Sequence, residues 1–162
     1  MIFYNSGLQQ HNTQQNLSQA GHKYLFSDEL HSWDEARAEC ALYGGWLVNI
    51  GGVREQNCLV RFVDTMGWSA KYWTDGSNDQ LYPYSSVSKI AAHAETLGVW
   101  AHAFDNAEVT WFSPKITCEC DDFCSGGGDA MRLDISSNPK WRGAWCDNSK
   151  TALNNFICEG II

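Results

Sequence analysis

The chain has 162 residues, of which 44% are hydrophobic and 13% aromatic, so it can form one globular domain and is not intrinsically disordered. Its formal net charge of -8 at pH 7 argues against nucleic acid or an anionic membrane as a partner. Seven cysteines favour an oxidising compartment. No stretch is apolar over enough residues to insert into a membrane, and residues 1–4 are too short for a signal-peptide core. We therefore expect a secreted, extracellular protein whose leader has been removed.

Short runs of strand-favouring residues dominate the chain. The first 22 residues are rich in Gln, Asn and Ser instead, so we interpret residues 1–22 as an N-terminal arm and residues 23–162 as the domain. Residues 76–96 form a long connection without a predicted element. The predicted strands are residues 23–26, 46–50, 71–74, 98–104, 109–112, 131–134, 142–145 and 155–159.

Two helices are predicted before most of these strands. Ser32 and Glu35 have the spacing of a capping box, which predicts a helix that begins at Trp33 and ends at the glycine pair 44–45. Residues 53–66 have an apolar face at helical spacing, and a glycine follows them. Two early helices followed by many short strands indicate an α+β domain.

Residues 118–129 fit neither a helix nor a strand pattern. They hold three cysteines, four carboxylates, one aromatic ring and a glycine run. Carboxylates this dense repel one another unless a cation lies among them, and calcium takes six to eight oxygen ligands. Zinc is the rival metal, but a Cys-X-Cys-X3-Cys run is not a standard zinc spacing, and oxidation removes the thiolates. A solvated acidic loop without metal is the third alternative.

Several short motifs follow one another in a recognisable order. They are residues 32–40, 45–50, 72–75, 98–100, 109–111, 145–147 and 156–159. Together they resemble the C-type lectin-like domain family over residues 23–160. The resemblance implies a C-type lectin-like fold, with two helices packed on short antiparallel sheets and a long loop that binds calcium and sugar. It also implies a disulfide between Cys40 and Cys158.

The calcium site of this family uses a Glu-Pro-Asn or Gln-Pro-Asp tripeptide, a later acid and an Asn-Asp pair. The nearest match is Glu119-Cys120-Asp121, in which a cysteine replaces the proline. Asp129 lies near the later acid and Asp147 matches the last Asp, while Cys146 stands in place of the Asn, so Asn148 is the candidate for the amide ligand. The candidate metal ligands are Glu119, Asp121, Asp122, Asp129, Asp147 and Asn148.

In lectins of this family, two vicinal sugar hydroxyls complete the calcium shell. Phe123 beside the glycine run, or Trp111, offers an aromatic face that suits galactose better than mannose. Trp100 and Trp145 are expected in the core instead. The candidate sugar-binding residues are Glu119, Asp121, Phe123, Trp111 and Asp147.

The odd number of cysteines leaves one thiol unpaired or bonded to another chain. Family members pair cysteines near Cys146, so Cys124 or Cys118 is its expected partner. The leftover thiol, Cys58 or a loop cysteine, suggests a disulfide-linked homodimer. Two sugar sites in one dimer would raise the avidity for glycans.

The sequence does not favour an enzyme. His93 and His102 lie near no nucleophile motif. The loop carboxylates are nearly consecutive, whereas a glycosidase places two on opposite sides of a bond. We expect a calcium-dependent lectin for terminal sugars of glycans, with galactose favoured. The alternatives are a C-type lectin-like module that recognises a protein or another surface, and a lectin that binds sugar without calcium.

Overall fold

A computed structural model of the chain describes residues 22–77, 101–102, 111, 113, 116–117 and 130–161. Residues 1–21 of the predicted arm, most of the long connection and the acidic loop 118–129 lie outside the described residues. The predicted strands 98–104 and 109–112 lie largely outside them as well.

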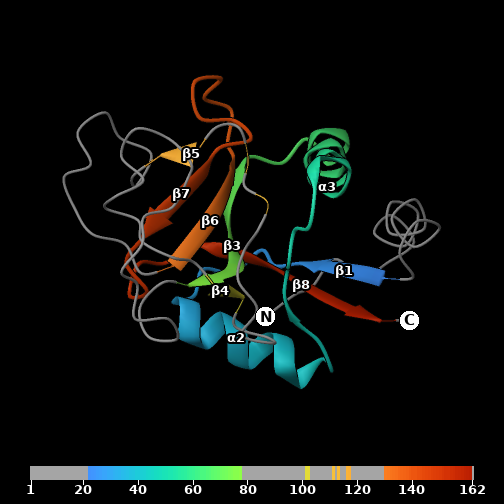
Figure 1. The fold of residues 1–162 in the computed structure, drawn as a ribbon, viewed down its shortest axis with the longest axis vertical. Coiled ribbons are helices and arrows are strands. Elements are labelled where there is room, and N and C mark those ends of the chain that lie inside the picture. The colour runs from blue at the N-terminus through green and yellow to red at the C-terminus, as the bar shows by residue number, and fades with distance from the viewer. Residues whose placement is uncertain are drawn as a thin grey trace.

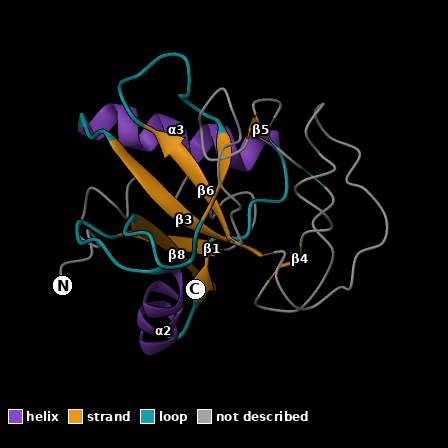
Figure 2. Cartoon of the chain, turned by 90° about the vertical axis from the view of Figure 1, so that its left-hand side faces the viewer, coloured by secondary structure: helices purple, strands orange, loops and turns teal. Residues whose placement is uncertain are grey.

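The described residues form two helices and eight strands. Figure 2 shows α2 and α3 on opposite sides of the strands. Neither helix is long and apolar enough to cross a membrane, as far as the described residues extend. The elements are β1 (His22–Phe26), α2 (Trp33–Leu42), β2 (Trp46–Leu47), α3 (Val53–Met66), β3 (Ala70–Ser77), β4 (Ala101–His102), β5 (Ile116–Thr117), β6 (Ala130–Ile135), β7 (Trp145–Asn148) and β8 (Asn155–Ile161).

The strands form one mixed sheet (Figure 1) with the order β1-β8-β3-β6-β7-β5. Strand β2 pairs with β8, and β4 pairs with β3. The predicted α+β class and C-type lectin-like architecture are confirmed. The pairing is antiparallel for most strands, as expected, but β3 pairs with β8 and β5 pairs with β7 in parallel.

Two predicted strands are shortened or displaced in the structure. Strand β2 ends at Leu47. The Val48 N–H still donates to the Ile157 carbonyl at 2.9 Å, whereas the Asn49 N–H donates to the Glu159 carboxylate at 2.8 Å. The predicted strand 142–145 is mostly a turn, and β7 begins three residues later than predicted. Gly143 has a φ of 83°, a left-handed conformation that ends the turn and that glycine adopts without steric cost.

The sheet separates two hydrophobic clusters, because successive side chains of a strand point to opposite faces. One cluster includes Tyr72 of β3 and Leu59 of α3. The other includes Trp73 of β3 and Trp33 of α2. Each helix therefore covers one face of the same strands.

The predicted disulfide between Cys40 and Cys158 is present, with an S–S distance of 2.02 Å. It joins α2 to β8 within the cluster that contains Trp73. The bond fixes the first helix to the last strand, as the family resemblance implies.

The predicted capping box at the start of α2 is also present. The Ser32 Oγ accepts from the Glu35 N–H at 3.3 Å, and the Glu35 carboxylate accepts from the Ser32 N–H at 3.0 Å. We expect Ser32→Ala to lower the free energy of unfolding by about 1 kcal/mol, because it leaves a helix-terminal N–H without its partner. Urea unfolding followed by circular dichroism measures this loss. Ser32→Asp, which keeps a capping oxygen, is the control, and equal losses in both variants would contradict the prediction.

Candidate functional site

The described strands frame the predicted calcium and sugar loop. Strand β7 lies between β5 and β6 in the sheet. Thr117, the last residue of β5, pairs with Cys146, and Ala130, the first residue of β6, pairs with Asn148. Residues 118–129 connect these two strands, so the chain leaves and re-enters the sheet on either side of β7. The loop candidates themselves, Glu119, Asp121, Asp122, Phe123, Cys124 and Asp129, lie outside the described residues.

The two described candidate metal ligands lie at the end of β7. Asp147 is 3% exposed and pairs with Met131, so its side chain lies on the Met131 face of the sheet. Asn148 lies on the other face. Its Oδ1 accepts from the Arg132 guanidinium at 3.1 Å and from the Asn154 amide at 3.0 Å. The Asn148 oxygen is therefore already engaged by a buried cation, and calcium would have to replace Arg132 there.

Cys146 forms a disulfide. The three cysteines of the acidic segment, Cys118, Cys120 and Cys124, lie outside the described residues, so the predicted pairing of Cys146 with Cys124 or Cys118 stays a prediction.

Cys58 accounts for the odd cysteine. Its thiol is unpaired and its side chain is 7% exposed on α3. A thiol at this depth does not fit the interchain role that the sequence suggested for Cys58, because α3 would have to open first. The odd count therefore no longer requires a bond to a second chain.

The two described tryptophans near the loop contact each other. Trp145 is buried in the core, as predicted, and the half-buried Trp111 forms a T-shaped contact with it, with ring centroids 5.4 Å apart. The Trp145 indole N–H donates to the Gln56 side chain at 2.6 Å. Gln56 also donates to the Gly143 carbonyl at 3.1 Å. Only part of the Trp111 ring is thus open to a sugar.

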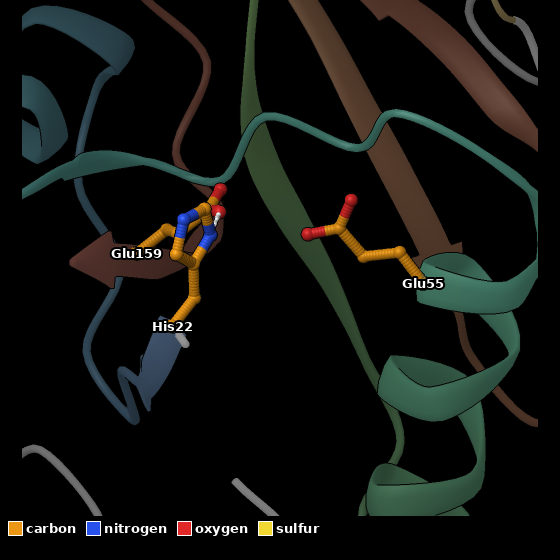
Figure 3. A group of neighbouring side chains, drawn as sticks. All are labelled: His22, Glu55 and Glu159. Atoms are coloured by element: carbon orange, nitrogen blue, oxygen red, sulfur yellow. Dashed lines mark hydrogen bonds and ion pairs between the residues drawn. The ribbon is translucent and has the colours of Figure 1, made fainter. Parts of the chain in front are cut away.

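The structure also brings together a polar group that the sequence analysis missed. His22 of β1, Glu55 of α3 and Glu159 of β8 place their nitrogen and carboxylate oxygens within 4.8 Å of one another. Figure 3 shows the Glu55 carboxylate directed toward the paired side chains of His22 and Glu159. His22 Nδ1 contacts the Glu159 carboxylate, and the Tyr24 hydroxyl donates to the Glu55 carboxylate.

The environment of this group disfavours a second negative charge. Burial of Glu159, followed by the negative charge of Glu55, raises its pKa to about 7. The pKa of Tyr24 is raised by burial, and further by the charges of Glu159 and Glu55. No local sequence motif could have revealed the group, since His22 and Glu159 are 137 positions apart.

Comparisons with known proteins identify the fold. No protein-family model and no curated protein sequence matches the chain. The carbohydrate-recognition domain of mouse scavenger receptor C-type lectin is 20% identical, with a TM-score of 0.62 over 88% of this chain and 92% of that one. The C-type lectin CEL-I from Cucumaria echinata is 18% identical, with a TM-score of 0.61 over 86% and 90%.

Herring type II antifreeze protein is 15% identical, with a TM-score of 0.60 over 88% of this chain and 92% of its own. The order of helices and strands, the disulfide between the first helix and the last strand, and these matches give one conclusion: the protein has the C-type lectin-like fold.

Proposed function

We propose that the protein is a secreted, calcium-dependent lectin that binds terminal sugars of glycans, with galactose favoured. The observation that supports this most directly is that the described residues flanking the acidic segment, Thr117 and Ala130, pair with Cys146 and Asn148 on either side of Asp147. The proposed ligands of calcium are Glu119, Asp121, Asp122, Asp129, Asp147 and Asn148. The proposed sugar-binding residues are Glu119, Asp121, Phe123, Trp111 and Asp147.

The strand residues on either side of the acidic loop support a calcium site formed jointly by the loop and Asp147. Consecutive Cα atoms are about 3.8 Å apart, so residues 118 and 129 lie one peptide from the residues paired with Cys146 and Asn148. The chain therefore enters and leaves residues 118–129 at the end of β7 that carries Asp147. The proposed donors are all oxygens, which is the ligand type that calcium prefers.

The matched structures support sugar binding as the general activity. One is named as a carbohydrate-recognition domain and another as a C-type lectin. The herring protein is named as an antifreeze protein, so the fold alone does not determine the ligand. Residues 23–162 would form the sugar-binding domain, and residues 1–22 the arm. A disulfide-linked homodimer stays a proposal that requires one of the loop cysteines.

A second candidate function is binding without calcium, to a sugar or to a protein surface. Arg132 favours it, because its guanidinium donates to the amide oxygen of Asn148 that calcium would use. A buried cation beside a calcium site repels the metal. The two candidates therefore differ in whether a chelator abolishes binding.

We expect Asp121→Ala and Asp147→Asn to weaken calcium binding at least tenfold, about 1.4 kcal/mol each, and to abolish retention on immobilised galactose. Each change removes one negative oxygen from the proposed shell, and Asn at 147 preserves the shape of the buried side chain. Calorimetric titration with calcium and galactose chromatography measure both effects.

Asp34→Ala is the matched control, since Asp34 is an exposed carboxylate on α2. Unchanged calcium and galactose binding by both site variants would place the site elsewhere. Galactose binding that survives a chelator would support the second candidate function instead.

A further inference from the structure

We propose that His22, Glu55 and Glu159 form a second metal site, separate from the acidic loop, that binds a transition-metal dication of the zinc type. The three ligands come from the first strand, the first turn of α3 and the last strand. A metal there would join three elements that are distant in the sequence.

The geometry suits a small ion. Zinc bonds of about 2.0–2.1 Å in a tetrahedron place ligand atoms about 3.3 Å apart. The His22 nitrogen and the Glu159 oxygen are closer than this, while all ligand atoms of the group lie within 4.8 Å. Shifts of about 1–1.5 Å in the side chains would therefore bring the three ligand atoms to the separations of a tetrahedral zinc site. The fourth position is left for water or another ligand.

Backbone groups already orient both carboxylates. The Asn49 N–H donates to Glu159 Oε1 and the Gly51 N–H donates to Glu55 Oε1, each at 2.8 Å. One oxygen of each carboxylate thus accepts a hydrogen bond from the backbone. The second oxygen of Glu159 contacts His22. The Tyr24 hydroxyl donates to the second oxygen of Glu55. Such outer partners fix the direction of metal ligands in proteins.

The charge of the group also points to a cation. Glu159 is buried, and Glu55 is half-buried beside it. Among the residues that the structure describes, no lysine or arginine forms an ion pair with Glu55 or Glu159. Glu159 forms an ion pair with His22, which carries a charge only when it is protonated. One imidazolium cannot neutralise two carboxylates, and burial of the remaining negative charge is unfavourable. A dication would neutralise both carboxylates.

The imidazole nitrogen of His22 indicates which class of metal the site would bind. Calcium and magnesium prefer shells of oxygen atoms, and calcium takes six to eight of them. Imidazole nitrogen with carboxylate oxygens suits zinc and related transition metals. The proposed site is therefore chemically distinct from the loop, whose candidate ligands are oxygens.

The test is a titration of the metal-free, disulfide-intact full chain with zinc, followed by calorimetry and thermal unfolding. We expect one zinc ion per chain at this site and a rise in the melting temperature, since binding to the folded state stabilises it. His22→Ala and Glu55→Gln should each weaken this zinc binding at least tenfold. Cobalt in place of zinc should give visible absorption bands that the His22→Ala variant loses.

Asp147→Asn is the matched control, because it alters the proposed calcium site and leaves His22, Glu55 and Glu159 intact. This variant should bind zinc as the wild type does. No zinc binding by the wild type, equal zinc binding by His22→Ala, or displacement of zinc by an equal concentration of calcium would each overturn the proposal. None of these outcomes depends on whether the protein binds galactose.

Discussion

Replacing both Cys40 and Cys158 with alanine is expected to lower the free energy of unfolding by about 4–5 kcal/mol. The bond closes a loop with a sequence separation of 118 residues, and the entropy that a cross-link removes from the unfolded chain grows with the loop it closes. Urea denaturation of the wild type and the double variant, followed by circular dichroism, measures the difference in their free energies of unfolding. The slope of the transition should change as well, because the unfolded variant is less compact.

Cys58→Ala is the matched control for this pair. Cys58 is buried and free, so its replacement removes a buried sulfur without removing a cross-link. We expect a loss of about 1 kcal/mol from it. If the double variant lost no more than twice this amount, the disulfide would contribute little beyond its packing.

The sequence predicts the helices better than the arrangement of the strands. The capping box at Ser32 and the apolar face of residues 53–66 are local signals, and both helices begin where these signals place them. Alternation along a strand indicates its two faces but does not identify its neighbours. The parallel pairing of β3 with β8 was therefore not predictable from the pattern of either strand.

The two proposed metal sites also differ in how far the sequence reveals them. The acidic loop is visible in the sequence because its residues are consecutive. His22, Glu55 and Glu159 come together only because β1 pairs with β8 and the N-terminus of α3 lies beside them. His22 falls within the predicted arm of residues 1–22, whereas the structure makes it the first residue of β1. A site assembled by strand pairing has no signature in the linear sequence.

The second large effect is expected at Gln56, which connects α3 to the strand that carries Asp147. Its buried side chain accepts from the Trp145 indole and donates to the Gly143 carbonyl. Gln56→Leu keeps the approximate volume but leaves the buried Trp145 N–H without an acceptor, at a cost of about 2–3 kcal/mol. Urea unfolding, monitored by tryptophan fluorescence, measures this loss.

Asn57→Leu is the matched control, because Asn57 is the exposed neighbour on the same helix. A double-mutant cycle with Trp145→Phe isolates the hydrogen bond, and we expect a coupling energy of about 1 kcal/mol or more. Additive losses in the cycle would show that the bond contributes little. Equal losses in Gln56→Leu and Asn57→Leu would show that the helix, and not the buried contact, is affected.

Gln56→Leu should also weaken calcium binding, although Gln56 is not a proposed ligand. Trp145 lies two residues before Asp147 on the same strand, so a change in its position is transmitted to that carboxylate through the backbone. Calcium titration of Gln56→Leu under fully folded conditions therefore tests the connection between the core and the proposed site. Normal calcium affinity in a destabilised variant would mean that the Gln56–Trp145 contact supports the fold alone.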